Sequence, residues 1–177
     1  MSPRRREPLG VEQALLGFFC AGPLHGYALL RALREPGGLG AVWRVKPGLL
    51  YAHLVRLEAE GLLHAGGDAP EGAGRKVYAL TGAGRERFDA WRRTPVARPR
   101  DFRLHFMVKW YWARETMPAA RALTDGQRRA CSLWLAVERE AESRTAGYER
   151  QVHSYRAGQI EALLAWLERC VAEWPPA

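Results

Sequence analysis

The chain lacks the features of a secreted, metal-binding or membrane-spanning protein. Its 177 residues include three cysteines, whose odd number and wide spacing fit neither a disulfide framework nor a set of metal ligands. We therefore expect Cys20, Cys131 and Cys170 to be reduced thiols in a cytoplasmic protein. No stretch approaches the roughly 20 apolar residues that span a membrane. The arginines at residues 4–6 do not lead into the apolar run of a secretory signal.

Signatures of catalysis and cofactor binding are also missing. The sequence contains none of the spacings that mark a metal site, a nucleophilic triad or a phosphate-binding loop. Its most glycine-rich stretch, residues 66–74, lies between two predicted strands, whereas a dinucleotide-binding loop joins a strand to a helix. We therefore expect no enzymatic activity, no cofactor and no bound metal ion.

Negative charge is scarce, and the shortage is uneven along the chain. The sequence has 27 Lys and Arg residues against 19 Asp and Glu residues, a net charge of +8. Residues 1–100 hold 16 basic and 9 acidic side chains, whereas residues 101–177 hold 11 and 10. A positive surplus confined to one part of a chain is typical of a nucleic-acid-binding surface.

The most informative segment is a predicted helix over residues 47–60. Leu50, Leu54 and Leu57 recur at i, i+4 and i+7, so they share one face and are expected to be buried. Gly61 follows, and glycine is the residue type that commonly ends a helix. The opposite face carries mostly short or hydrogen-bonding side chains, as a helix close to base edges requires: Leu49, Ala52, His53, Arg56 and Glu60.

A β-hairpin is predicted directly after this helix. Leu62 and Leu63 begin its first strand, a glycine-rich turn follows, and residues 75–80 form a basic return strand. A winged-helix DNA-binding domain has this layout, with a helix for the major groove and a cationic ribbon for the backbone or minor groove. An exposed helix and a surface hairpin with solvated charges would show the same pattern.

Further helices are expected on both sides of these elements. They cover residues 9–21, a segment that begins near Pro23, and residues 83–93, where Thr81 can cap the first turn. Residues 95–100 contain two prolines and are predicted to form a linker. We therefore predict a mainly α-helical fold with a small β-hairpin, in which residues 9–94 form an N-terminal winged helix-turn-helix domain.

Residues 101–174 are predicted to form a C-terminal antiparallel helical dimerisation domain. Helices are expected over residues 102–113, from Thr124 or Asp125 to about Tyr155, and after Gly158. A seven-residue repeat in the long helix suits a partner helix: Trp134, Ala141, Tyr148 and Tyr155. The apolar stripes of these helices would leave a large patch exposed in a monomer. We therefore expect a homodimer whose contacts include four residues: Tyr148, Val152, Leu163 and Leu167.

Several motifs together give the chain a specific resemblance to a known family. These are GPLHGY at residues 22–27, GLLYAHLVRLE at 48–58, GL at 61–62, RKVYALT at 75–81 and AG at 83–84. With them the chain resembles the PadR family of transcriptional regulators over essentially its whole length. The resemblance implies a winged helix, a helical dimerisation domain, operators of dyad symmetry and repression relieved by a small aromatic effector. Leu49 and Ala52 depart from the family, which usually has Ser or Thr and Pro there.

The outer face of the helix and the resemblance together predict the DNA contacts. They are Lys46, Gly48, Tyr51, His53, Arg56, Arg75 and Lys76. Tyr51 could instead be a half-buried aromatic residue. Successive strand residues point to opposite faces, so we expect one of Arg75 and Lys76 to contact phosphate. His25 stands near the start of a helix, where a structural role explains it as well as an effector contact does.

An effector pocket is predicted between the winged helix and the C-terminal helices. Trp110 and Trp134 offer rigid surfaces for stacking a flat ligand, and His153 offers a polar contact. The same aromatic side chains could instead close the core and the dimer interface. A ligand held there would release DNA by favouring one spacing of the two recognition helices.

These observations predict a cytoplasmic homodimer that binds a double-stranded DNA operator and represses transcription. The alternative is an adaptor, a winged helix that binds a protein partner without specific DNA binding. The two hypotheses differ in one feature, because an adaptor has no need for Tyr51, His53, Arg56 and the cations of the return strand on a single surface.

Overall fold

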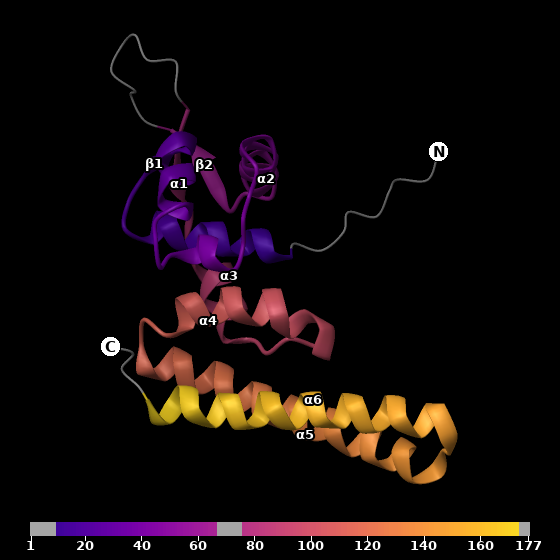
Figure 1. The fold of residues 1–177 in the computed structure, drawn as a ribbon. Helices are drawn as coiled ribbons and strands as arrows, with labels where there is room; N and C mark the ends of the chain where they lie inside the picture. Colours follow the sequence, from indigo (N-terminus) through magenta and orange to yellow (C-terminus); the bar gives the residue numbers. More distant parts are fainter. Residues whose placement is uncertain (1–9, 67–75, 174–177) are drawn as a thin grey trace. The chain divides into compact units, whose positions relative to one another are not determined.

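A computed structural model describes residues 10–66 and 76–173 of the chain (Figure 1). The chain forms two compact units, Met1–Trp91 and Arg92–Ala177. The described part is mainly helical with one small antiparallel sheet, which confirms the predicted fold class. None of its helices is both long and apolar enough to cross a membrane.

The first unit is a winged helix. It begins with the 3₁₀ helix η1 (Val11–Cys20), strand β1 (Leu24–His25) and helix α1 (Gly26–Leu33). The 3₁₀ turn η2 (Leu39–Ala41), helix α2 (Pro47–Ala59), strands β2 (Leu63–Ala65) and β3 (Val77–Leu80), and helix α3 (Gly82–Arg93) follow. The predicted helices and hairpin are therefore present, although the first helix is of the 3₁₀ type.

The sheet has three strands rather than the two of the predicted hairpin. Its order is β1-β3-β2, with both pairs antiparallel; Leu24 lies opposite Tyr78, and Leu63 lies opposite Leu80. The sequence assigns residues 24 and 25 to the beginning of a helix, because two residues are too few to show the alternating pattern of a strand. His25 instead caps α1, since its Nδ1 accepts the N–H of Ala28 at 3.0 Å.

Helix α2 has the buried face that its sequence predicts. Leu50, Leu54 and Leu57 have no exposed surface. Gly61 follows the helix with φ of +71°, a conformation that glycine adopts readily, and the N–H of Leu62 donates to the carbonyl oxygen of Leu57 at 2.9 Å. This closure ends α2 and leads the chain directly into β2.

Thr81 joins the sheet to α3, as predicted. Its Oγ1 accepts the N–H of Gly84 at 2.9 Å and donates to the carbonyl oxygen of Gly61 at 2.8 Å. A Cβ atom on Gly84 would lie 2.1 Å from the carbonyl oxygen of Leu62, so only glycine fits at this approach. The first turn of α3 therefore packs on the turn that ends α2, which holds the hairpin against that helix.

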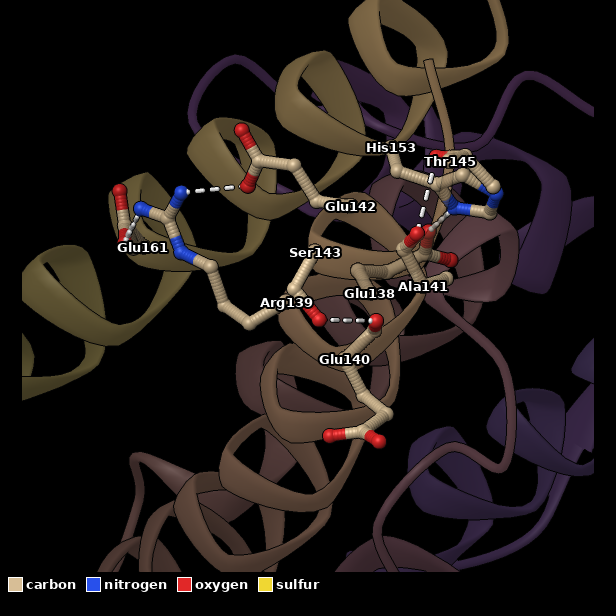
Figure 2. Close-up of polar contacts among 9 residues, drawn as sticks. All are labelled: Glu138, Arg139, Glu140, Ala141, Glu142, Ser143, Thr145, His153 and Glu161. Atoms are coloured by element: carbon tan, nitrogen blue, oxygen red, sulfur yellow. Dashed lines mark hydrogen bonds and ion pairs between the residues drawn. The ribbon is translucent and has the colours of Figure 1, made fainter.

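The second unit is helical. After the 3₁₀ turn η3 (Pro99–Asp101), the π-helical turn η4 (Phe102–Phe106) continues into α4 (Met107–Ala113). Two long helices follow, α5 (Met117–Arg144) and α6 (Gly147–Ala172), and they lie side by side (Figure 1). Ion pairs between Arg128 and Glu168 and between Arg139 and Glu161 show that the pairing is antiparallel, as predicted. Figure 2 shows the second of these pairs.

The predicted limits of the two long helices are wrong. Helix α5 begins after Thr116, and Thr124 lies inside it, with its Oγ1 donating to the carbonyl oxygen of Ala120 at 2.8 Å. The helical structure is interrupted at residues 145 and 146, and Gly147 then begins α6 with φ of +57°. Gly158 lies inside α6. The seven-residue repeat from Trp134 to Tyr155 therefore crosses a break and is not one continuous helix face.

The predicted linker is also wrong, because part of it belongs to the second unit. Val96 is 5% exposed and joins the apolar core of that unit. Its N–H donates to Oε1 of Gln127 on α5 at 2.8 Å. The Pro95 ring lies 3.4 Å from the position of a Cβ on Gly126. The two prolines suggest a linker in the sequence, but a buried valine between them anchors the segment to α5.

The core of the second unit is rich in aromatic rings. The rings of Phe102 and Phe106 stack with centroids 4.2 Å apart, and Trp166 packs edge-on against both. Leu167 belongs to the same core and has no exposed surface. It therefore cannot gain burial against a second copy, and its predicted dimer contact is corrected to a role within the α5–α6 pair.

Candidate nucleic-acid interface

The exposed side of α2 presents a strip of small side chains. Gly48, Ala52, Val55 and Ala59 follow one another at i, i+4, i+7 and i+11, and all four are exposed. Val55 has the largest side chain of the four and is 57% exposed. A helix with such a low surface can approach base edges closely, and its methyl groups suit the methyl group of thymine. We call these four residues the α2 strip.

Tyr51 lies beside the α2 strip and is held by the start of α1. Its ring lies over Gly26, where a Cβ atom would be 2.5 Å from Cε1 and 3.2 Å from the phenolic oxygen. The tyrosine is nevertheless 45% exposed, so the glycine positions an aromatic ring at the surface without burying it. A phenol in this place has a hydroxyl that can donate to a phosphate oxygen.

The hairpin contributes a cation to the same flank of α2, on which Tyr51 lies. Nζ of Lys76, the residue before β3, lies 2.6 Å from Oε2 of Glu58, which stands seven residues after Tyr51. The ammonium also lies 5.2 Å from the centre of the Tyr78 ring. The hydrogen bond to Glu58 raises the pKa of Lys76, so the side chain stays cationic. Arg75 lies outside the described residues, and its role stays a prediction.

The other flank of α2 carries Arg56, held by an acid from η1. Nη1 of Arg56 lies 2.7 Å from Oε1 of Glu12. Glu12 is 5% exposed and also accepts the N–H of Gly10 at 3.0 Å, whereas about a third of the Arg56 side chain (34%) is exposed. The guanidinium is therefore anchored by a buried acid while part of the Arg56 side chain stays exposed at the surface of α2.

His53 lies deeper than its predicted position on the outer face. The side chain is half-buried, and its ring centre is 6.0 Å from that of the buried Trp43. Burial lowers the pKa of His53 below its ordinary value of 6.5, while the charges of Glu12 and Arg56 act in opposite directions. The ring is therefore neutral at pH 7 and offers one donor and one acceptor rather than a cation.

Lys46 and Gly48 stand at the amino end of α2. Lys46 is the residue before the helix, and Pro47 begins it; the side chain of Lys46 is exposed and makes no capping hydrogen bond. The N–H groups of a first helical turn attract anions, and a cation beside them adds to this effect. The described DNA-contact candidates thus all lie on or beside α2, from its first turn to its last.

Sequence reasoning missed several residues of this surface. Val55 shares the α2 strip with Gly48, a relationship visible as an i, i+7 spacing. Tyr27 on α1 is 59% exposed and follows the glycine under Tyr51. Glu12 was detectable as a carboxylate within the apolar run of residues 11–20, but its partner lies 44 residues away in sequence. Periodicity within one helix carries no signal for such a pair.

The predicted effector contacts lie in the second unit. Trp110 and Trp134 are half-buried and pack against the core, with the ring of Trp110 edge-on to Trp166 at 6.3 Å. Nδ1 of His153 on α6 lies 2.6 Å from Oε2 of Glu138 on α5, and this contact joins the two helices (Figure 2). The two tryptophans therefore pack against the core of this unit, whereas His153 pairs with an acid of α5.

The cysteines form no disulfide. Burial raises the pKa of both Cys131 and Cys170, that of Cys170 to about 11, so these thiols are protonated at pH 7. Within residues 10–66 and 76–173, no group of three or more His, Cys, Asp or Glu side chains could hold a metal ion.

Comparison with known proteins places the sequence similarity in the unit that contains α2. Residues 15–90 match the model of the transcriptional regulator PadR-like family. The transcriptional regulator Rv3488 of Mycobacterium tuberculosis is 41% identical over 82 residues, which cover 46% of this chain and 72% of that protein. An uncharacterized 37.1 kDa protein in transposon TN4556 of Streptomyces fradiae is 42% identical over 76 residues, which span 43% of this chain and a fifth (20%) of that protein.

Solved structures show a weaker similarity that extends further along the chain. The crystal structure of Bacillus subtilis PadR in complex with operator DNA is 22% identical, with a TM-score of 0.47, and the match covers 94% of this chain and 99% of that chain.

Proposed function

This chain belongs to the transcriptional regulator PadR-like family, and from that premise we propose that it represses transcription as a homodimer on an operator of dyad symmetry. In this proposal the two copies place equivalent α2 helices in successive major grooves, so the half-site centres lie about one helical turn, or a whole multiple of it, apart. The regulated genes are to be found by selecting bound fragments from a genomic DNA library.

The observation that carries the proposal is the α2 strip between two anchored cations. Ala52 and Val55 can lie against base edges, with Arg56 on one side to donate to a base and Lys76 on the other to reach the backbone. Tyr51 and Lys46 supply further donors for phosphate oxygens. Arg75 is included among the proposed phosphate contacts.

One observation favours the adaptor instead. Four large apolar or aromatic side chains of the first unit are exposed on or near α2, and a protein partner could cover them: Tyr27, Leu49, Tyr51 and Val55. Fluorescence anisotropy with the selected DNA separates the two hypotheses. A regulator binds its selected fragment at least about 10³-fold more tightly than unrelated DNA of the same length at physiological salt. An adaptor binds both equally and weakly.

The proposed dimer has support in the exposed surface of the second unit. Leu133 and Val137 on α5 and Tyr148 and Tyr155 on α6 are all largely exposed, Tyr148 by 80%. We propose that a second copy covers these side chains, with Val152 at the same interface and Leu163 at its edge.

Sedimentation of the full chain tests this dimer. Leu133→Glu with Val137→Glu should convert a micromolar solution from dimer to monomer. Ser132→Glu adds an acid to an exposed position of the same helix and should leave the dimer intact. A wild-type chain that sediments as a monomer would contradict the proposal.

The proposed effector is a small aromatic molecule that contacts Trp110, Trp134 and His153. It would release the operator to the extent that it binds one arrangement of the dimer more tightly than the other, and full release of a tight complex requires several kcal/mol of such preference. Titration of tryptophan fluorescence with planar aromatic compounds tests the placement in Trp110→Leu and Trp134→Leu chains that still dimerise. Quenching and operator release that persist unchanged in both variants would exclude it.

A further inference from the structure

The second unit contains a pocket that the proposed DNA-binding surface does not use. Its volume is about 960 Å³, and it lies between residues 98–103 on one side and the α5–α6 pair on the other, where Glu138 and residues 156–163 line it. Pockets that hold small organic ligands have volumes of roughly 300–1,000 Å³. The whole pocket belongs to one unit, so this unit alone determines its shape.

Positive charge is concentrated at the rim of this pocket. Arg98, Arg100 and Arg103 line it from the η3–η4 segment, and Arg156 lines it from α6. All four arginines are exposed. Within the described part of the chain, no carboxylate lies within ion-pair distance of the first three. Guanidinium groups gathered around an opening are a suitable site for a carboxylate or phosphate group.

One acid in the pocket lining, Glu138, pairs with one of the four arginines. Oε2 of Glu138 lies 4.0 Å from Nη1 of Arg156. The same oxygen lies 2.6 Å from Nδ1 of His153 (Figure 2). Glu138 therefore competes with an incoming anion for Arg156 but leaves the three arginines of residues 98–103 available. His153, one of the residues predicted to contact an effector, does not line the pocket but pairs with Glu138, which does.

The rest of the pocket lining is largely apolar and mostly aliphatic. Ile160 is buried, and Ala162, Leu163 and Pro99 add further aliphatic surface. Phe102 contributes an aromatic ring, but this ring already stacks on Phe106 with centroids 4.2 Å apart and meets the edge of Trp166. Little ring surface is left to sandwich a flat ligand, whereas aliphatic walls accommodate a flexible chain.

We propose that this pocket binds an organic anion with an acyl body, whose carboxylate or phosphate group lies among the arginines and whose chain covers Ile160 and Leu163. Burial of each methylene favours binding by about fourfold, which corresponds to 0.8 kcal/mol per CH₂. Binding is measured without DNA and does not rest on the proposed repressor function. An effect of the ligand on operator binding would rest on that function.

Calorimetric titration of the full chain with decanoate, below the concentration at which it forms micelles, tests the proposal. We expect saturable binding that weakens at least tenfold for decanol, which lacks the charge, and for acetate, which lacks the chain. Affinity should rise from octanoate to decanoate by up to about sixteenfold for two methylenes. Equal binding of decanol and decanoate, or tighter binding of 2-naphthoate than of decanoate, would overturn the proposal. Decanoate and decyl phosphate, compared directly, separate the two possible head groups.

Variants then locate the site. Arg100→Gln with Arg103→Gln should weaken decanoate at least tenfold, whereas Arg129→Gln, at an exposed position of α5 outside the pocket, should not change its affinity. Glu138→Gln should tighten binding several-fold because Arg156 loses its competing acid. Circular dichroism verifies that each variant is folded. Unchanged affinity for decanoate in the double variant would overturn the assignment. Binding of decanoate only under conditions in which the chain sediments as a monomer would overturn it as well.

Discussion

Nη1 of Arg56 on α2 lies 2.7 Å from Oε1 of Glu12 in η1, although the two residues are 44 positions apart in sequence. The acid is almost completely buried and the arginine is one-third exposed. A buried carboxylate thus anchors a guanidinium whose side chain is still about one-third exposed (34%). On the other flank of α2 a second acid, Glu58, pairs with Lys76, although this carboxylate is partly exposed (29%). Both Arg56 and Lys76, two of the proposed DNA-binding cations, are therefore paired with an acid in the absence of DNA.

Arg56→Ala should cost about 1–3 kcal/mol of operator binding and relax the preference at one base pair per half-site, if the guanidinium donates to a base edge. Glu12→Gln should keep part of the affinity but reduce discrimination, because an unanchored guanidinium binds phosphates of any sequence. Anisotropy with the selected operator and with unrelated DNA measures both effects. Glu86→Gln removes an acid from an exposed position of α3 and serves as the charge-matched control.

The same pair also affects stability, and this must be separated from DNA reading. Arg56→Ala leaves the buried carboxylate of Glu12 without its guanidinium, so the unfolding free energy should fall by about 1–3 kcal/mol. The double variant with Glu12→Gln should recover stability but not operator discrimination. Discrimination that is unchanged in Arg56→Ala would contradict the assigned role of this residue.

Binding of DNA should depend strongly on salt. If each protomer neutralises three or four phosphates, the plot of log affinity against log salt concentration for the dimer should have a slope of about −5 to −7. Lys76→Ala should weaken all sequences about equally and reduce the magnitude of this slope by about 2 for the dimer. Glu58→Gln, which removes the intramolecular partner of Lys76, should strengthen all sequences several-fold. Titrations from 50 to 300 mM salt measure the slope, and a flat response would exclude phosphate binding by this surface.

Gly26→Ala should separate DNA binding from folding. The added Cβ would lie 2.5 Å from Cε1 of Tyr51 and must displace the ring. Alanine favours a helix over glycine by about 0.5–1 kcal/mol, so the unfolding free energy should change little. Operator affinity should fall about as much as in Tyr51→Ala, and the double variant should lose no more than either single one. Gly82→Ala is the control, because a Cβ there meets open space. Additive losses would show that the ring is not the means by which Gly26 acts.

Lys109 should make the stability of the second unit depend on pH. Its side chain is 7% exposed, Nζ donates to the carbonyl oxygen of Thr94 at 2.8 Å, and burial lowers its pKa from 10.5 to about 8. Between pH 8 and 10.5 the unfolded chain keeps a proton that the folded chain has released, so the unfolding free energy rises with pH. The rise is up to about 3 kcal/mol, at 1.4 kcal/mol per pKa unit.

Urea unfolding at pH 7 to 10 measures this effect. Lys109→Met should be more stable than wild type below pH 8, and its advantage should shrink steadily toward pH 10. Lys46→Met, at an exposed position, is the control for replacing a lysine by methionine. A difference between Lys109→Met and wild type that stays constant with pH would mean that Lys109 is protonated equally in both states.

Local patterns predicted the winged helix well. The spacing of Leu50, Leu54 and Leu57 indicates which face of α2 is buried, and Gly61 marks its end, because both depend on residues within one or two turns. Longer helices were predicted less well. Thr124 has a side chain suited to capping a helix, yet it lies inside α5, where its hydroxyl donates to the carbonyl oxygen of Ala120 in the preceding turn. Helix α6 continues without a break through Gly158. Packing between α5 and α6 outweighs these local preferences.

The sequence by itself determined where the helices and the β2–β3 hairpin of the first unit lie, the positive charge of residues 1–100 and membership of the family, since periodicity, composition and motifs are properties of neighbouring residues. Only the tertiary structure decided which acid meets which cation, that Gly26 lies under Tyr51, and that Val96 is anchored to α5. The physical reason is that side chains distant in the sequence meet only after the backbone has brought their elements together. Their pairing then depends on distances of a few ångströms that no local pattern specifies.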